Sequence, residues 1–279
     1  MLEICLLGGF KLWREQVSLP VKTQALRELL SYLILNNKPI RRETVAEDLW
    51  GEQTTGDACK KLRQQLWLLR SLLSEHHLSE FQLSEDENHD TLHLEISKDV
   101  EIDVFQIRQA QRLLAPGIPI GLAEIEILNR AVSLYESDLL EGCNAQWCLQ
   151  ERERYRDFMG SIFERLIASC KEHARWQQAF EYTQKALQLE PTRESVHYQA
   201  IWLHVQQADY VGALRQFERC TKVLQDAFGV KPCAATTALM SFGTPYSGVN
   251  RRVNPDLLET VLRIQSTLSD LVQRLEKTR

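Results

Sequence analysis

The chain has 279 residues, of which 44% are hydrophobic and 25% charged, and its net charge is −5 at pH 7. This length exceeds the size at which single hydrophobic cores usually stop growing, so we expect at least two domains. The composition excludes a fibrous or wholly disordered protein. No apolar run approaches the roughly 20 residues of a membrane span, and the first residues lack a basic leader. We therefore expect a cytoplasmic protein without a membrane partner.

Seven cysteines are spread along the chain, without any C-x-x-C motif. Cys143 and Cys148 form the closest pair. Most of the others lie on the apolar faces of predicted helices, where a thiol behaves as a small hydrophobic group. We therefore expect reduced structural cysteines rather than a metal or redox site.

The first part of the chain begins with a strand pattern. Residues 2–20 alternate apolar and polar side chains on both sides of Gly8-Gly9, which predicts a small antiparallel sheet. Apolar residues then recur at helical spacing in three segments, which we predict to be helices at residues 23–35, 42–49 and 58–73. Asp57 is placed to cap the third of these helices.

A hairpin completes this part of the chain. Two alternating segments, residues 80–84 and 91–96, flank a turn of polar residues. Four acidic residues lie in or beside this turn: Glu85, Asp86, Glu87 and Asp90. Strands, three helices and a hairpin in this order predict a winged helix-turn-helix domain over residues 1–97.

Residues 98–240 are helical almost throughout and contain an internal repeat. The segment around Trp176 and Ala179 recurs around Tyr210 and Ala213, 34 positions later, which is the tetratricopeptide period. A helix pair of this kind cannot bury its apolar face alone and must stack on neighbouring helices. We therefore predict an all-α, tetratricopeptide-like domain here, and a mainly α fold for the whole chain.

The last part of the chain is predicted to be a linker, residues 241–255, and an amphipathic helix, residues 256–279. The helix carries a heptad seam formed by Leu257, Val261, Ile264, Leu268, Leu271 and Leu275. A seam this short either reinforces a homodimer or packs against the chain's own domain, and the sequence favours neither.

The sequence lacks the motifs of common enzymes. It has no GxxxxGK[ST] loop, no GxGxxG after a strand and no GxSxG elbow. His89 and His93 have a spacing that suits metal ligands, but they run from a loop into a strand, so their rings need not converge. We predict no catalysis, no metal and no cofactor.

The third predicted helix carries a basic face. Every charged residue between Ala58 and Leu73 is positive. Arg and Lys side chains pair with guanine edges in the major groove, and Gln side chains pair with adenine edges. We predict a recognition helix that contacts double-stranded DNA through Lys60, Lys61, Arg63, Gln64, Trp67 and Arg70. The alternatives are an ordinary solvated face and, for Trp67, packing against the hairpin.

Basic residues near the starts of the first two helices are candidates for the DNA backbone. We predict that Lys22, Arg41 and Arg42 hold phosphates there, with ordinary surface charge as the alternative. The acidic hairpin turn would repel phosphate. The wing therefore turns away from DNA or meets a protein such as polymerase, or else the domain binds DNA weakly.

The order of the motifs resembles a known family. The segments Leu6–Phe10 and Leu49–Gly51, with the leucines of the third helix, resemble the winged-helix half of the Streptomyces antibiotic regulatory protein (SARP) family. The segment Glu101–Phe105, Trp147 and the segment Gly229–Pro232 resemble that family's bacterial transcriptional activator domain.

This resemblance implies an OmpR-type winged helix that binds direct repeats near promoters and recruits RNA polymerase, with the helical half aiding dimerisation. By position, Lys60, Lys61, Arg63 and Gln64 fall on the recognition helix and Arg70 near its end. Trp67-Leu68 and the acidic turn depart from the family pattern.

The leading functional hypothesis is thus a sequence-specific, DNA-binding transcription activator that acts as a dimer. One alternative is a protein-interaction adaptor, in which the helical groove binds a partner and the winged helix does not bind DNA. A second alternative is a sensor that takes a small ligand in the helical domain. The sequence does not name the signal, the ligand or the target genes.

Overall fold

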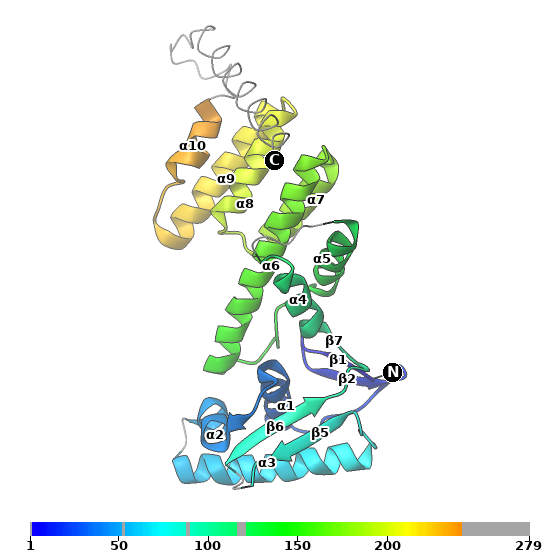
Figure 1. Cartoon of the computed structure of the whole chain (residues 1–279). Coiled ribbons are helices and arrows are strands. Elements are labelled where there is room, and N and C mark those ends of the chain that lie inside the picture. Colours follow the sequence, from blue (N-terminus) through cyan, green and yellow to red (C-terminus); the bar gives the residue numbers. More distant parts are fainter. Residues whose placement is uncertain (1, 52–53, 88–89, 116–120, 242–279) are drawn as a thin grey trace, which may run out of the picture.

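The computed structural model describes residues 2–51, 54–87, 90–115 and 121–241 (Figure 1). An N-terminal part with two small sheets and three helices lies at one end, and a stack of helices extends away from it (Figure 1). The predicted linker and C-terminal helix lie outside the described residues, apart from Ser241. The heptad positions Leu257, Val261, Ile264, Leu268, Leu271 and Leu275 are therefore not described either.

The first sheet gathers the N-terminal strands and one strand from much later in the chain. Strands β1 (Leu2–Cys5), β2 (Lys11–Arg14) and β3 (Val17–Ser18) are antiparallel, as predicted. Strand β7 (Val100–Ile102) then pairs in parallel with β1, which gives the order β3-β2-β1-β7. We do not predict β7 from the sequence, because three residues are too short for a periodic pattern.

Three helices follow the first strands. They are α1 (Gln24–Asn36), α2 (Arg42–Trp50) and α3 (Thr55–Glu75). Thr23 caps α1 by accepting a hydrogen bond from the Leu26 amide. The predicted cap and start of the third helix are wrong: α3 begins at Thr55 rather than Ala58, and Thr54 is its cap. Asp57 lies inside the first turn, where its charge suits the positive end of the helix dipole.

The predicted hairpin forms the second sheet together with a short strand. Strands β5 (Phe81–Glu85) and β6 (Thr91–Ile96) are antiparallel, and β4 (Ile40–Arg41) joins the far side of β6 in the order β4-β6-β5. The side chains of Leu92 and Leu94 on β6 are buried in the core that this sheet shares with the helices.

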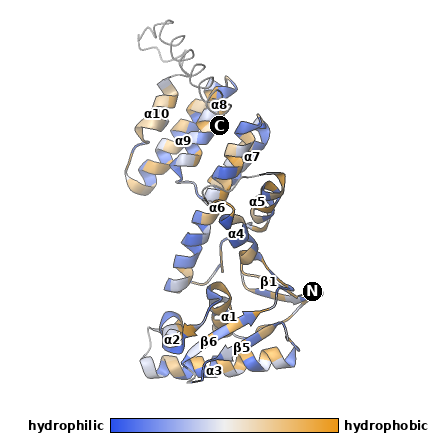
Figure 2. Ribbon diagram, in the orientation of Figure 1, coloured by the Kyte–Doolittle hydropathy of each residue, from blue (hydrophilic) through white to orange (hydrophobic). Residues whose placement is uncertain are grey.

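The remaining elements are helices. They are α4 (Asp103–Arg112), α5 (Leu122–Leu134), α6 (Gln146–Glu172), α7 (Trp176–Leu189), α8 (Glu194–Gln206), α9 (Tyr210–Phe228) and α10 (Ala234–Ser241). Helix α6 pairs with α7 and α8 with α9, while α7 packs on α8 and joins the two pairs. Figure 2 shows hydrophobic and hydrophilic residues mixed along each helix, as expected where one face is buried. No described helix is long and apolar enough to cross a membrane.

The backbone confirms the 34-residue repeat. The turns after α6 and α8 each contain an alanine with positive φ, 52° at Ala174 and 56° at Ala208. The following amide of each turn donates to the carbonyl five residues earlier, from Arg175 to Cys170 at 2.8 Å and from Asp209 to His204 at 2.9 Å. These are equivalent Schellman turns, 34 residues apart.

The two parts of the chain share hydrogen bonds at a continuous junction. The Leu140 amide donates to the Leu6 carbonyl at 2.8 Å, and the Gly8 amide donates to the Asp138 carbonyl at 2.7 Å. The buried carboxylate of Asp103 accepts the amides of Leu6 and Leu7 at 2.8 and 2.9 Å. The end of β1 is thereby fixed against the helical part.

Candidate nucleic-acid interface

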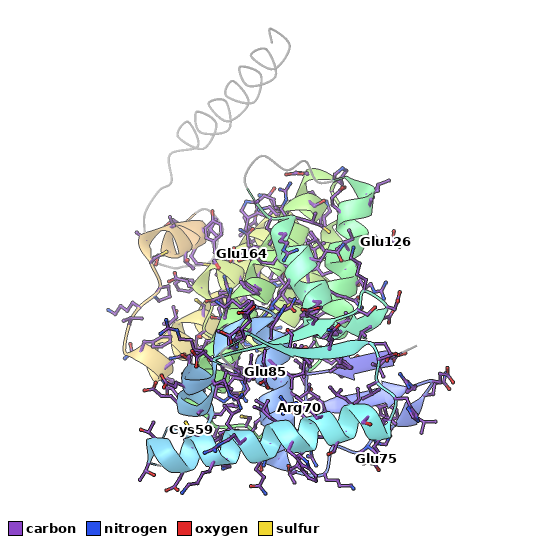
Figure 3. All side chains as sticks on the ribbon, turned by 60° about the horizontal axis from the view of Figure 1, so that its bottom comes forward. Cys59, Arg70, Glu75, Glu85, Glu126 and Glu164 are labelled. Atoms are coloured by element: carbon purple, nitrogen blue, oxygen red, sulfur yellow. The ribbon has the colours of Figure 1, made fainter. Side chains whose placement is uncertain are left out.

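Helix α3 lies along the outer edge of the N-terminal part, where one of its faces is free (Figure 3). Its leucines at positions 62, 66 and 69 are at most 2% exposed and pack into the core. Because a helix turns once in 3.6 residues, the residues between these leucines point outward. The leucine stripe therefore determines which side chains are available to a ligand.

Most of the predicted recognition residues lie on this outer face. The side chain of Lys60 is 73% exposed, and Arg63 and Gln64 are exposed as well. Lys60 lies 3.3 Å from Asp57, and the Arg63 Nε donates to the Cys59 carbonyl at 3.4 Å. Lys61 differs, because its ammonium group lies 5.1 Å from the centre of the Trp50 ring and its side chain is half-buried.

Trp67 lies on the same outer face. It is 65% exposed, so the alternative in which it fills a gap against the hairpin is wrong. An indole ring held out to solvent offers a flat apolar surface and an N–H donor next to the basic side chains.

Arg70 and Arg42 are held together by one carboxylate. Glu85, at the end of β5, forms an ion pair with Arg70 and a second with Arg42 at 3.3 Å (Figure 3). The Glu85 side chain is only 12% exposed. With Lys60, which pairs with Asp57, three of the nine predicted DNA contacts are therefore already paired with an acid inside the domain.

A second acid of the hairpin is also used internally. One carboxylate oxygen of Asp86 accepts the amides of Asp90 and Thr91 at 2.7 and 2.8 Å, which closes the turn. These hydrogen bonds hold the pKa of Asp86 below its usual value, with the Thr91 amide as the largest cause. Two acidic residues of the wing, Glu85 and Asp86, therefore stabilise the domain itself. The sequence does not predict these contacts, because the partners are either distant along the chain or main-chain amides.

The other two residues predicted to contact the DNA backbone lie directly before the first two helices. Lys22 directly precedes the cap of α1, and Arg41 is the residue before α2. Both side chains are exposed. Together with α3 they present positive charge from three places in the N-terminal part: the segment before α1, β4 and α3.

The described residues contain no group of three or more metal-binding side chains. His93 lies 3.8 Å from Glu95 on the same strand, and His89 is outside the described part of the chain.

The comparison with family models identifies the class of protein. Residues 100–241 match the model of the bacterial transcriptional activator domain. The chain belongs to this family. This membership supports the SARP-type transcriptional regulator that the order of its motifs predicts. The family match points to a transcription regulator.

One solved structure with this fold is Mycobacterium tuberculosis EmbR in complex with a low-affinity phosphopeptide. The TM-score is 0.69 at 18% sequence identity, and the match covers 86% of this SARP-type chain and 64% of EmbR. The chain thus spans about two thirds of the EmbR chain, and the likeness confirms the predicted mainly α fold with an N-terminal winged helix. No curated protein sequence matches the chain.

Proposed function

We propose that the chain activates transcription by binding specific double-stranded DNA sites through the outer face of α3. The observation that supports this most is the exposure of Lys60, Arg63, Gln64 and Trp67 on one face of a helix whose opposite face is core. An α-helix fits the major groove, and these are side chains that hydrogen-bond to base edges there.

Different residues of this interface have different tasks. Arg63 and Gln64, near the middle of the exposed face, are proposed to read bases, because their side chains form paired hydrogen bonds to guanine and adenine. Lys60, Lys22 and Arg41 are proposed to contact phosphates, which position the protein without specifying sequence. Lys61, half-buried against Trp50, is proposed to contact a phosphate beside the groove.

The wing is proposed to contribute to DNA binding only weakly. Glu85 holds Arg42 and Arg70, so these two arginines reach phosphate only if the ion pairs open. The acids of the wing that remain exposed, such as Glu87, favour a contact with a protein, for which RNA polymerase is the proposed partner.

The experiment for the DNA contact is a mobility-shift selection followed by titration of the selected site and a scrambled site. Arg63→Ala and Gln64→Ala are each expected to reduce the preference for the selected site by about 1–3 kcal/mol. Arg215→Ala and Gln225→Ala change the same residue types at exposed positions of α9 and should preserve the preference. Unchanged preference in the α3 variants would remove these residues from the proposed site.

The salt dependence measures the phosphate contacts separately. If four to eight phosphates are contacted, log K should fall against log salt with a slope of roughly −4 to −7, at about −0.9 for each phosphate. Lys60→Ala should weaken binding to all sequences equally and reduce the slope by about one. Absence of enriched sites at low salt would contradict DNA binding altogether.

We further propose that the chain acts as a homodimer and that the helical part receives a partner or a signal. Large apolar side chains on α9, at Val211, Leu214 and Phe228, are exposed, which is typical of a contact surface. Light scattering on the full chain and on a chain that ends at Gly248 tests the heptad seam. Loss of the dimer in the shorter chain would assign the seam to self-association.

The same apolar surface supports the second candidate function, an adaptor that binds a protein partner without DNA. Transcription in vitro distinguishes the two. An activator raises transcript yield with purified RNA polymerase on a template that carries the selected site, and Arg63→Ala abolishes the increase. An adaptor leaves the yield unchanged with and without the site.

A further inference from the structure

Two cysteines lie close together where the N-terminal and helical parts meet. Cys148 is in the first turn of α6, and Cys143 precedes that helix by three residues. Cys143 is 8% exposed and Cys148 is fully buried. Their segment is part of the junction, because Leu139 bridges to Leu7 and the Leu140 amide donates to the Leu6 carbonyl.

The surroundings of Cys143 favour its thiolate form. The neighbouring Cys148 side chain is the largest cause that lowers the pKa of Cys143, and the Ala145 backbone and the positive charge of Arg152 act in the same direction. Burial and the Glu28 carboxylate act in the opposite direction, but the pKa of Cys143 is lowered overall. The nearby Cys143 and burial raise the pKa of Cys148, so Cys148 stays protonated.

Arg152 fixes the geometry of the pair. Its guanidinium donates to the carbonyls of Leu139, Leu140 and Cys143 at 3.0, 2.9 and 3.0 Å. It also lies 3.9 Å from the sulfur of Cys148. One side chain therefore holds the backbone of Cys143 against the start of the helix that carries Cys148.

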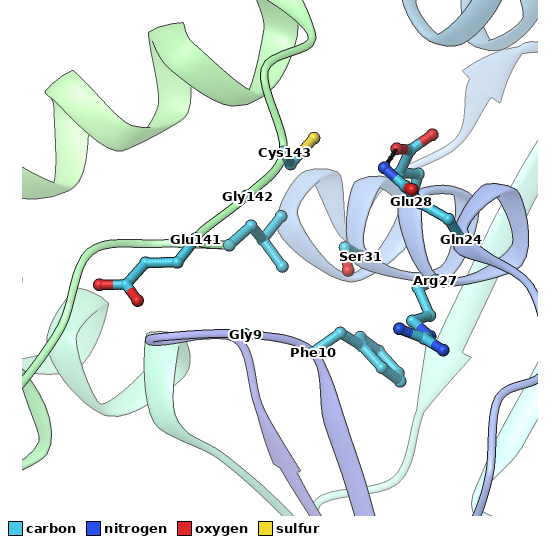
Figure 4. A pocket seen from close by; sticks show the side chains of 10 residues that line it. Gly9, Phe10, Gln24, Arg27, Glu28, Ser31, Glu141, Gly142 and Cys143 are labelled. Carbon is cyan, nitrogen blue, oxygen red and sulfur yellow. Dashed lines mark hydrogen bonds between the residues drawn. The ribbon is translucent and has the colours of Figure 1, made fainter.

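A pocket gives small molecules access to this place. It has a volume of about 340 Å³ and lies between α1, the Gly9-Phe10 segment and residues 140–143, with Cys143 in its lining (Figure 4). Ser31, on the α1 side of the pocket, is fully buried, and none of the described residues forms a hydrogen bond with its hydroxyl. Ser31 and Cys143 therefore line the same pocket.

We propose that Cys143 and Cys148 are a peroxide-sensitive pair that closes into a reversible intramolecular disulfide. The Cys143 thiolate attacks one peroxide oxygen, the O–O bond breaks, and the leaving hydroxide takes a proton to become water. The Cys148 sulfur then attacks the resulting sulfenic acid, forms the S–S bond and releases a second water. Two thiols lose two electrons, hydrogen peroxide gains them, and a dithiol reductant reverses the change.

Other cysteines of the chain lack this environment. Burial raises the pKa of Cys5 and Cys170, and it raises that of Cys220 to about 11. These three remain thiols at neutral pH, so none of them is expected to be the first thiol to attack peroxide. They serve as internal references for the reaction of Cys143.

Peptide mass spectrometry on the full chain tests the proposal. Residues 131–152 contain both cysteines and form one tryptic peptide without internal Lys or Arg. After treatment with hydrogen peroxide and then iodoacetamide, this peptide should lose two hydrogen atoms and take no alkyl groups. A dithiol should restore two alkylation sites. A peptide that is still doubly alkylated while exposed Cys233 is oxidised would overturn the proposal.

Single variants separate the role of Cys143, which attacks peroxide, from that of Cys148, which closes the disulfide. Cys148→Ser should leave a sulfenic acid on Cys143 that dimedone traps, and Cys143→Ser should abolish both dimedone capture in this peptide and the disulfide. Cys233→Ser, at an exposed position, should leave the disulfide unchanged. Dimedone on Cys233 but not on Cys143 in the Cys148→Ser chain would contradict the proposed order. If Cys143→Ser or Cys148→Ser fails to fold, the mass of the wild-type peptide alone shows whether the disulfide forms.

Discussion

Glu85 is the single residue that most limits the basic surface of the N-terminal part. Its carboxylate pairs with Arg70, whose side chain is 52% exposed, and with Arg42, which is 23% exposed. Ion pairs this close to solvent stabilise a fold by only about 0–1 kcal/mol. Their main consequence is therefore that one carboxylate offsets part of the charge of two cations that would otherwise face phosphate.

Glu85→Gln is expected to release both arginines. If the proposed DNA binding is correct, affinity at low salt should rise and the salt slope should steepen by about 1–2, since each new phosphate contact contributes roughly 0.9. Fluorescence anisotropy over a salt series measures both. Glu87→Gln removes the same charge from an exposed wing position and is the control. Equal slopes in the two variants would show that Glu85 does not restrain the arginines.

His197 makes the stability of the helical part depend on pH. It is fully buried, with Nε2 2.8 Å from the Pro191 carbonyl and Nδ1 2.7 Å from the Gln216 amide nitrogen. One neutral tautomer satisfies both contacts by donating to Pro191 and accepting from Gln216. Protonation would place a second N–H against an amide donor.

Burial lowers the pKa of His197 below the ordinary value of 6.5, so the unfolded chain binds this proton more readily than the folded chain. The contribution to stability is complete above pH 6.5 and is lost as the pH falls from there towards the folded pKa. Thermal denaturation between about pH 8 and pH 5.5 should show this loss. His197→Gln should flatten the profile, while His77→Gln, at an exposed position, should keep the wild-type profile.

At the scale of single elements, the sequence predicted the helices that have a regular apolar period. The same period predicted which face of each helix is exposed. The leucines of α3 repeat often enough to fix which side is buried, so the exposure of Arg63 and Gln64 followed directly. The ion pairs of Glu85 did not follow, because it meets Arg42 and Arg70 only through tertiary packing. No local pattern encodes such a contact.

The repeat turns offer a test of element stability. Ala174 and Ala208 adopt the left-handed conformation, which costs a residue with a side chain about 1–2 kcal/mol. Glycine avoids this cost but loses about 0.5–1 kcal/mol through the entropy of the unfolded chain. Ala174→Gly and Ala208→Gly should each stabilise the fold by roughly 0.5–1 kcal/mol.

Urea denaturation of these variants gives the change in the free energy of unfolding. Ala227→Gly is the control, because Ala227 is exposed within α9 and lies in the regular helix, where glycine costs about 1 kcal/mol. Destabilisation of similar size at all three positions would mean that the turns gain nothing from glycine.

At the scale of the whole molecule, the sequence predicted the succession of the two parts but not how they join. Strand β7 pairs with β1, for example Val100 with Leu2, and Asp103 binds the Leu6 amide across 97 residues of chain. Neither carries a periodic pattern. The proposed boundary after residue 97 therefore falls before a strand that completes the first sheet. Because that strand leads directly into α4, we expect the N-terminal and helical parts to unfold as one cooperative unit.

Asp103→Ala tests this coupling. The substitution leaves the amides of Leu6 and Leu7 without their acceptor in a buried place, which should cost about 2–4 kcal/mol and lower the Tm by roughly 5–10 °C. Calorimetry should show one transition in the wild type and a broader or split transition in the variant, because the junction is weakened more than either core. Asp99→Ala, at an exposed turn, should behave as wild type. Two separate transitions in the wild-type chain would mean that the shared sheet does not couple the two parts.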